Sequence, residues 1–233
     1  VMPVGKLLVN MSLPIMISMF VQALYNVVDS IFVAQVGEQA LAAVSLAFPV
    51  QTLMIAVSVG TGVGINSLLS RRLGEKRYED ANAAATNGVF LCVVSSLVFA
   101  LFGLFFSEMF FRAFTADETI IEMGRQYLGI CTVFSIGVFV QVAMERILQA
   151  TGVTIYNMLM QGAGAITNII LDPIFIFGWF GLPAMGVAGA AIATVVGQIV
   201  AMGLGIYFNH KKNHEVSMSF KGFRLNGRII GEI

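Results

Sequence analysis

Six apolar segments, each long enough to cross a lipid bilayer, follow one another in the first 208 residues of this chain. A membrane-spanning helix needs roughly 20 predominantly apolar residues. Backbone N–H and C=O groups cannot stay unpaired in lipid, so only helices or closed barrels cross it, and the segments lack the alternating pattern of barrel strands. The sequence therefore predicts an all-α membrane protein, a six-helix bundle with spans at residues 7–33, 41–70, 81–107, 124–146, 157–176 and 187–208.

The composition agrees with a membrane location. Charged residues make up 11% of the chain and hydrophobic residues 58%, whereas a soluble domain carries roughly 25% charged residues. The net charge is zero, so the overall charge points to no nucleic-acid partner, and we expect the lipid bilayer as the surroundings. Cys92 and Cys131 both lie in apolar segments, where we expect buried free thiols rather than a disulfide or a metal site.

The basic residues predict the orientation. If the N-terminus is cytoplasmic, all but two of the 13 Lys and Arg residues fall on the inner side, and only Arg112 and Arg125 lie outside. The positive-inside rule then places both termini of the chain in the cytoplasm. Residues 209–233 are basic and polar and are predicted as a cytoplasmic linker. Because the apolar pattern only resumes at the last residues, we expect a further lobe to be missing.

One outer connection is long and amphipathic. Residues 108–123 carry four acidic side chains between two apolar segments. We predict a short helix on the membrane surface here, with Thr115 or Asp117 as its N-cap.

The fifth segment carries a polar face. Gln161, Gly164, Asn168 and Asp172 are spaced so that they share one side of a helix, and Pro173 removes a backbone donor just after the carboxylate. Ionisable groups at bilayer depth usually serve an ion, proton or substrate site, and oxygen ligands at a broken helix suit a small cation. The alternative is a structural hydrogen-bonded contact between helices.

The first segment carries a second polar stripe, which ends on an acid. Its members are Ser18, Gln22, Tyr25, Asn26 and Asp29. At about 1.5 Å per residue, Asp29 and Asp172 both reach the outer half of the membrane, which permits one shared site. Such a stripe should face water or protein rather than lipid.

The remaining polar positions are less specific. Thr194 and Gln198 lie one turn apart in the sixth segment among small residues that favour close helix packing. Gln141, Glu145 and Gln149 form a stripe on the fourth segment, where we expect Glu145 and Arg146 to form an interfacial ion pair or an inner gate contact.

Several short motifs, in this order and spacing, resemble the multidrug and toxic compound extrusion (MATE) family, in its bacterial MepA-like branch. They are Asp29-Ser-Ile-Phe-Val, Leu41-Ala-Ala-Val-Ser with Phe48-Pro49, Arg72-Leu-Gly-Glu, Asn168-Ile-Ile-Leu-Asp-Pro and Gly189-Ala-Ala-Ile-Ala-Thr. The resemblance covers essentially the whole chain. It implies the N-terminal lobe, residues 1–208, of a twelve-helix transporter made of two six-helix lobes.

The resemblance also implies site residues. A family cation site of this lobe would match Asp29, Asn168, Asp172 and Thr194, with Na⁺ held at the first three of them or H⁺ in its place. We expect the polar residues around them to line a substrate cavity: Gln22, Tyr25, Asn26, Gln161 and Gln198. No catalytic residue and no cofactor other than the coupling ion are expected.

The predicted function is that of a secondary active transporter and not of an enzyme: a Na⁺- or H⁺-coupled antiporter exporting cationic or amphipathic drugs across the bacterial cytoplasmic membrane. A lipid-linked oligosaccharide flippase of the same superfamily is an alternative, although its cavity should be more basic. An intramembrane aspartyl protease is another, but its Gly-x-Gly-Asp signature is absent from the sequence. A membrane interaction module with purely structural acids is the third.

Overall fold

The computed structural model describes residues 4–216 and 227–233, and this part of the chain is almost entirely helical. Five helices are long and apolar enough to span a membrane, or six if a bent pair counts as one span. The predicted all-α membrane fold is therefore confirmed. The helices are α1 (Val4–Val36), α2 (Glu38–Gly74), α3 (Tyr78–Phe114), α4 (Glu118–Val133), α5 (Ile136–Ala150), α6 (Ile155–Phe177), α7 (Val187–Lys212) and α8 (Gly227–Glu232), with a 3₁₀ turn η1 (Trp179–Gly181) after α6.

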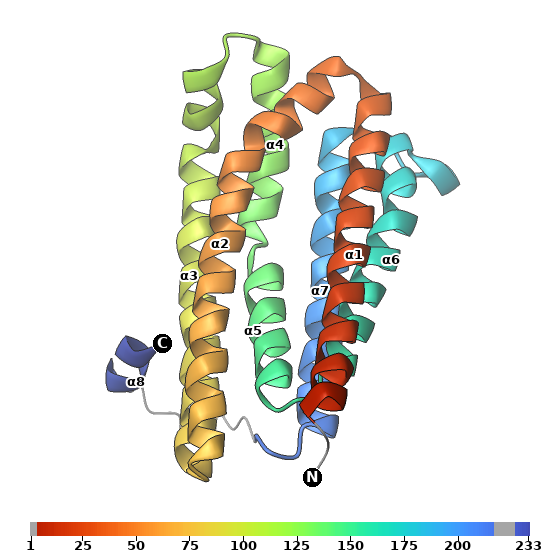
Figure 1. The fold of residues 1–233 in the computed structure, drawn as a ribbon. Coiled ribbons are helices and arrows are strands. Elements are labelled where there is room, and N and C mark those ends of the chain that lie inside the picture. The colour runs from red at the N-terminus through yellow and green to blue at the C-terminus, as the bar shows by residue number, and fades with distance from the viewer. Residues whose placement is uncertain (1–3, 217–226) are drawn as a thin grey trace.

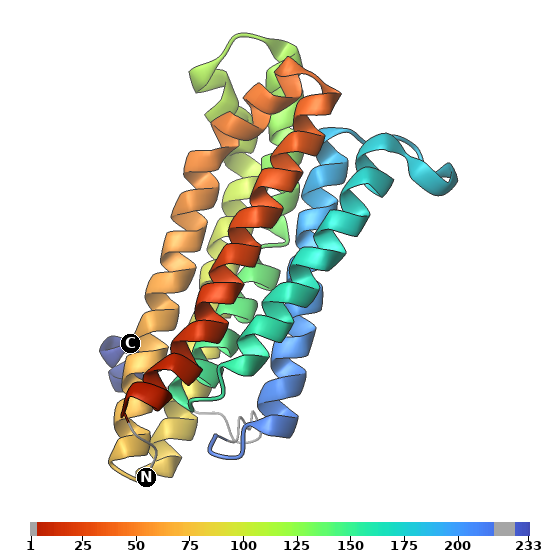
Figure 2. The same ribbon diagram turned by 45° about the vertical axis from the view of Figure 1, so that its right-hand side comes forward.

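The spans run alternately up and down. The α2–α3 and α5–α6 connections and the end of α7 lie at the end of the bundle where the N-terminus lies (Figure 1). The α1–α2, α3–α4 and α6–α7 connections lie at the opposite end, and the α4–α5 connection lies part-way along the bundle. Helices α1, α6 and α7 stand together on one side of the bundle, and α2, α3, α4 and α5 stand on the other (Figures 1 and 2). Helix α7 joins the two groups, because it packs against α6 as well as against α4 and α5.

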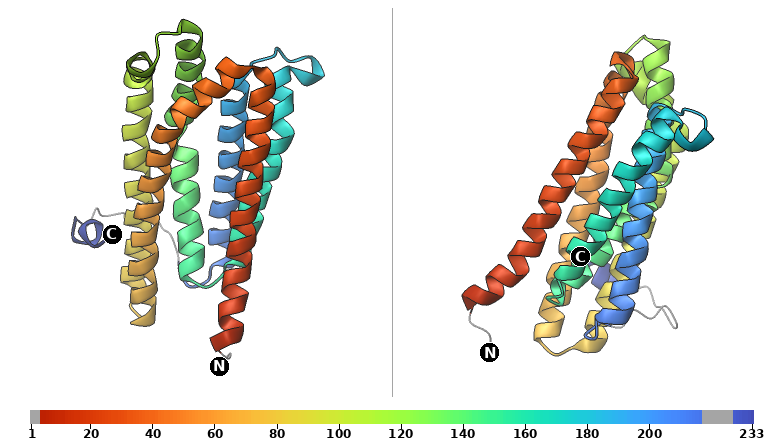
Figure 3. Two further views of the ribbon diagram at one scale, coloured as in Figure 1. Left: turned by 45° about the horizontal axis from the view of Figure 1, so that its top comes forward. Right: turned by 90° about the vertical axis from the view of Figure 1, so that its right-hand side faces the viewer.

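Helix α1 lies at the edge of the bundle and packs mainly against α6 (Figure 3). Its outward side chains are large and apolar, and Met16, Phe20 and Val27 are each more than half exposed. An apolar helix of this kind is stable in lipid rather than in water. The edge position leaves α1 with few contacts to α2, although the two follow each other in sequence.

The prediction of one continuous helix over residues 124–146 is wrong, because the structure has two helices there. The helix ends at Val133 and resumes at Ile136, and its two parts, α4 and α5, are bent by 43°. At the break, the Ser135 hydroxyl donates to the carbonyl of Ser96 on α3 at 3.1 Å. A side-chain hydrogen bond of this kind competes with the regular helical pattern, and no proline marks the position in the sequence.

The separate surface helix predicted over residues 108–123 is also wrong. Its first part forms the last turns of α3, and its second part forms the first turns of α4. The reason is packing, because Phe111 is fully buried and continues the apolar face of α3. The predicted cap is confirmed at Asp117, whose Oδ1 accepts the backbone N–H of Thr119 at 2.9 Å.

The predicted linker over residues 209–233 contains more helix than expected. Helix α7 continues to Lys212, and α8 occupies Gly227–Glu232. Lys221 and Arg224, which contribute to the inner charge, lie outside the described residues.

Glycines permit the close contact between α6 and α7. A Cβ atom on Gly197 of α7 would lie 2.8 Å from the carbonyl oxygen of Gly164 on α6, and one on Gly189 would lie 2.5 Å from the backbone of Phe175. Only glycine permits backbones to approach this closely. The close packing predicted from the small residues of the last span is confirmed, and it fixes α6 and α7 as one unit.

Candidate functional site

The α6–α7 unit holds the most deeply buried acid of the described residues. Asp172 has no exposed surface, and Asn168, one turn earlier on α6, is 2% exposed. Pro173 does not end the helix, which continues to Phe177. The side chains of Asp172 and Asn168 therefore lie on one continuous helical face, as the spacing predicts.

Asn168 connects the acid to α7. In the amide orientation that satisfies both sides, Nδ2 donates to Asp172 Oδ2 at 3.2 Å, and the amide oxygen accepts from Thr194 Oγ1 at 3.3 Å. A carboxylate offers only acceptors, so the amide nitrogen belongs on its side. The structure thus brings together three of the four predicted cation-site residues through direct hydrogen bonds, and Asn168 orients the carboxylate.

Asp29 approaches the same cluster from α1. Its Oδ1 atom is buried and has no hydrogen-bond partner, and its charge acts on Asp172. Tyr25, one turn earlier on α1, interacts electrostatically with both carboxylates. Because α1 packs on α6, the two acids share one region of the protein. A buried carboxylate oxygen without a partner is uncommon in folded proteins, and the binding of a cation or proton there stays a prediction.

A second set of polar side chains near Asp29 was not expected from the sequence. Gln51 of α2 donates through Nε2 to the Tyr127 hydroxyl at 3.2 Å and to Cys131 Sγ at 3.7 Å. Both Tyr127 and Cys131 lie within the electrostatic influence of Asp29. The one feature of the sequence that could have indicated this polar set is Gln51, an isolated amide in an apolar span.

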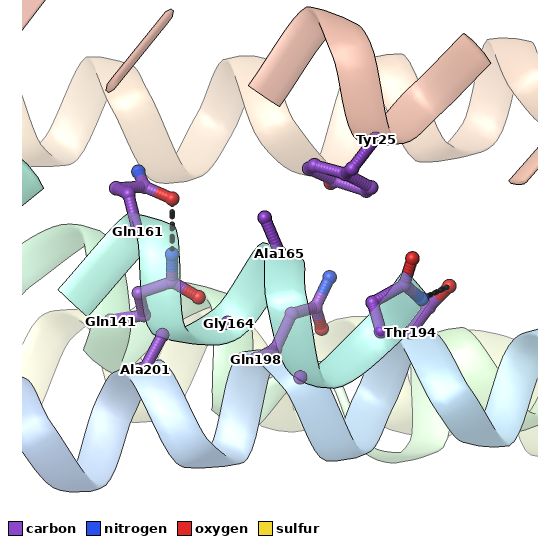
Figure 4. A pocket seen from close by; sticks show the side chains of 10 residues that line it. Tyr25, Gln141, Gln161, Gly164, Ala165, Thr194, Gln198 and Ala201 are labelled. Atoms are coloured by element: carbon purple, nitrogen blue, oxygen red, sulfur yellow. Dashed lines mark hydrogen bonds between the residues drawn. The ribbon is translucent and has the colours of Figure 1, made fainter. Parts of the chain in front are cut away.

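A pocket adjoins the acidic cluster. It is small and open to solvent: about 30 Å³ admits the centre of a water molecule, and about 290 Å³ is free of atoms when the open solvent at its mouth is included. Figure 4 shows it between α1 on one side and α6 and α7 on the other. The residues around it are Tyr25, Gln141, Gln161, Gly164, Ala165, Asn168, Thr194, Gly197, Gln198 and Ala201. Thr194 lies at one end and the Gln141–Gln161 pair at the other. Small side chains on α6 and α7 leave the space, and amides supply most of its polarity.

Three of the five predicted cavity residues line this pocket, namely Tyr25, Gln161 and Gln198. The other two do not. Gln22 is half-buried and Asn26 is exposed, because Asn26 follows Tyr25 by one residue and points about 100° away around the helix. Gln141 lines the pocket instead, and its amide stripe on the fourth span was the signal that could have placed it there.

The direct ion pair expected between Glu145 and Arg146 is not formed. Glu145 Oε1 accepts from Gln149 Nε2 at 2.9 Å, while Arg146 donates to the oxygen of the same amide at 2.8 Å. Adjacent residues on a helix point in different directions, so Gln149 stands between the two charges. Glu145 Oε2 accepts from Gln161 Nε2 at 2.9 Å, which ties it to the pocket.

The donor atoms of the acidic cluster are carboxylate, amide and hydroxyl oxygens. These are hard ligands, which favour alkali or alkaline-earth cations and protons over transition metals. Among residues 4–216 and 227–233, no group of three His, Cys, Asp or Glu side chains is placed to hold a metal ion.

A helical bundle of lipid-facing spans, with buried acids beside an amide-lined pocket, is the architecture of a polytopic membrane protein that handles polar ligands within the bilayer. The chain belongs to the MatE family, whose model matches residues 14–174. It is 31% identical over 99% of its length to the FAD transporter of Shewanella oneidensis and covers 52% of that protein. It is 27% identical over 99% of its length to the multidrug export protein MepA of Staphylococcus aureus and covers 51% of it.

Solved structures give the same result. A MOP superfamily transporter from Pyrococcus furiosus superposes with a TM-score of 0.89 at 31% identity, over 97% of this chain and 50% of that one. Structures of MATE in a straight and in a bent conformation match with TM-scores of 0.88 and 0.86. The chain spans about half the length of the relatives it matches, in agreement with the predicted lobe of a larger MATE-type fold.

Proposed function

We propose that this chain forms the N-terminal lobe of a cation-coupled antiporter, which exports cationic or amphipathic compounds across a bacterial cytoplasmic membrane in exchange for Na⁺ or H⁺. The observation that carries the proposal is the contact between the pocket and the acidic cluster. Asn168 and Thr194 line the pocket, and Asn168 also donates to Asp172. A change at the acids therefore reaches the pocket wall through one side chain.

The proposed coupling step is the entry of a cation from outside at Asp29 and Asp172. The bound Na⁺ or H⁺ neutralises part of their charge and reorders the hydrogen bonds of Asn168 and Tyr25. Helix α1 is the element that responds, because it carries Asp29 and Tyr25, contains Pro14 and has few contacts with α2. Ligand release follows only if the cation and the drug prefer different conformations of the lobe.

The lining of the pocket supports a cationic cargo, because it includes amides, hydroxyls and aromatic surface but no Lys or Arg side chain. The similarity to a protein named FAD transporter supports a second candidate, a flavin nucleotide. Such a ligand carries phosphates, which proteins usually bind with Arg, Lys or backbone N–H groups. We therefore rank it below a cationic compound.

The proposed partners are the lipid bilayer, the transported small molecule and a second lobe that completes the cavity. The proposed orientation puts the N-terminus and the end of α7 in the cytoplasm. The reason is that the last turn of α2 and the α2–α3 connection, at the same end of the bundle, carry Arg71, Arg72, Lys76 and Arg77.

The test is dye efflux from vesicles that contain the protein expressed from its complete gene. An imposed Na⁺ gradient and an imposed pH gradient are compared, with ethidium as the cationic dye and FAD as the competing anion. We expect one of the two gradients to drive ethidium export. Asp29→Asn should abolish this export at unchanged expression, because an amide has no negative charge with which to bind the Na⁺ and no site at which to take up the H⁺. Gradient-driven export that survives Asp29→Asn, or export of FAD but not of ethidium, would refute the proposal.

A further inference from the structure

A chain of side-chain hydrogen bonds begins at the inner end of the pocket and ends on a carboxylate outside it. Gln141 Nε2 donates to Gln161 Oε1 at 3.1 Å, and Gln161 Nε2 donates to Glu145 Oε2 at 2.9 Å. Figure 4 shows the first of these two bonds, between the labelled glutamines. Every donor in the chain points toward Glu145, so the two amide dipoles are aligned with its charge.

Glu145 accepts its hydrogen bonds from neutral amides, and the charge of the neighbouring Arg146 also acts on it. Its side chain is 9% exposed, and both carboxylate oxygens accept amide hydrogen bonds, one from Gln161 and one from Gln149. Within the described part of the chain, no Lys, Arg or His side chain forms an ion pair with it. A buried carboxylate strengthens the hydrogen bonds that it accepts, because the local dielectric is low.

The pocket end of the chain is incomplete. Gln141 is 7% exposed, and its Oε1 atom is buried without a hydrogen-bond partner. Leaving a buried acceptor unpaired costs free energy. The oxygen belongs to a residue that lines the pocket and lies beside Gly164 (Figure 4), so the pocket is the side from which a ligand N–H group would approach it.

We infer that Gln141, Gln161 and Glu145 form a subsite for an N–H donor of a protonated amine, with Gln141 Oε1 as the atom that binds it and Glu145 as a positioning residue. This inference rests on the proposed function and specifies one part of its substrate class. The ligand ammonium donates to Gln141, whose own amide donates to Gln161, which donates to Glu145. Each bond in such an aligned chain polarises and strengthens the next.

The geometry gives the subsite a selectivity that charge alone does not supply. A quaternary ammonium ion of the same charge feels the same field but has no hydrogen to give to Gln141. The subsite is also separate from the acidic cluster, because the glutamine pair and Thr194 lie at opposite ends of the pocket. A protonated amine can therefore occupy it without displacing a cation from Asp29 and Asp172.

The experiment measures binding of two ligands by titration calorimetry, using the protein expressed from its complete gene and reconstituted in lipid nanodiscs. The ligands are 4-phenylbutylammonium and its N,N,N-trimethyl derivative, which differ in N–H donors but not in charge. We expect the first to bind about tenfold more tightly, the factor that one hydrogen bond involving a charged group contributes. Gln141→Met should reduce the ratio of the two dissociation constants to below about two.

Glu145→Gln keeps the size and the hydrogen-bonding groups but removes the charge, and we expect the ratio to fall to about three. Gln198→Met is the matched control, because Gln198 lines the same pocket but is not in the chain of hydrogen bonds. It can weaken both ligands together but should preserve their ratio. Thermal unfolding of each variant shows whether the binding comparison is made on folded protein.

An unchanged ratio in folded Gln141→Met, or an equal loss of ratio in Gln198→Met, would overturn the inference. These outcomes are independent of transport. If gradient-driven efflux fails while the wild-type ratio and its loss in Gln141→Met are observed, the proposed function is wrong and the subsite stands. If efflux is normal and the ratio is near one in the wild type, the subsite is wrong and the proposed function stands.

Discussion

Asn168 is the residue through which the buried acid and the pocket are joined. Its amide nitrogen donates to Asp172, and its oxygen accepts from Thr194. Both polar atoms of the side chain are therefore hydrogen-bonded, one to the acid and one to α7. Rotation of this amide would release the carboxylate and the threonine hydroxyl together. A cation that takes oxygen ligands from the cluster must therefore compete with these two bonds.

Replacing Thr194 with valine tests this connection at nearly constant volume. The change removes the hydroxyl that holds the amide oxygen of Asn168, at a cost of about 1 kcal/mol. We expect the apparent affinity for the driving cation to change by about three- to tenfold, as measured from initial efflux rates at varied Na⁺ or pH.

Thr167→Val is the matched control for that prediction. Thr167 lies on α6, next to Asn168 in sequence, but its hydroxyl donates to the carbonyl of Ala163 within its own helix at 2.8 Å. This variant should leave the cation dependence unchanged. Equal effects of the two substitutions would show that Thr194 acts through general packing and not through Asn168.

At the scale of the helices, α6 and α7 form the closely packed part of the site, and α1 packs mainly against α6. Helices α6 and α7 pack closely at Gly164 and Gly197, where their backbones are in contact. Helix α1 lies at the edge of the bundle with large exposed apolar side chains. Since one acid lies on α6 and the other on α1, movement of α1 changes their separation.

Gly197→Ala is expected to destabilise the protein by about 1–3 kcal/mol, because the added methyl group would meet the Gly164 carbonyl, which cannot rotate away. Thermal unfolding of the purified protein in detergent measures the effect. Gly203→Ala, on the same helix at an exposed position with nothing within 4 Å of the new Cβ, should be neutral or slightly stabilising. A lower melting temperature for Gly203→Ala than for Gly197→Ala would contradict the packing argument.

At the scale of the molecule, the charges separate the two ends of the bundle. The end with the N-terminus carries the α2–α3 connection, where the hydrogen bond from Arg71 lowers the pKa of Glu75. The opposite end carries the acidic side chains around Asp117, together with Arg112 and Arg125. Because the described helices alternate in direction, the charge distribution of the ends decides the orientation of all of them together.

Cysteine labelling tests this orientation. With a membrane-impermeant maleimide applied to intact cells, Ala116→Cys in the α3–α4 connection should be labelled, because Ala116 is exposed at the end that the proposed orientation places outside. Glu79→Cys, exposed in the first turn of α3, should be labelled only after the cells are opened. The parent protein supplies the background, since Cys92 and Cys131 are both buried. The reverse pattern would invert the topology and place the site in the inner half of the membrane.

The helical membrane fold could be predicted from the sequence because the lengths and hydropathy of segments are local properties. The two extended connections and the break between α4 and α5 could not, because they depend on contacts such as Ser135 with Ser96, which come from different helices. The same distinction applies to the site. The spacing on α6 placed Asn168 and Asp172 on one face, whereas nothing in α1 indicates which of two neighbouring residues, Tyr25 or Asn26, faces the pocket.

By itself, the sequence determined the apolar membrane spans and the faces of the polar residues on each helix, since these follow from composition and from 3.6-residue periodicity. The family was indicated separately, by the resemblance of short motifs. The tertiary structure alone decided which faces meet. In the structure, Glu145 accepts a hydrogen bond from Gln161 and does not pair directly with Arg146, and Gln141 lines the pocket. The physical reason is that pairing between helices is set by their packing, through contacts such as Gly164 with Gly197, and packing joins residues that are far apart in the chain.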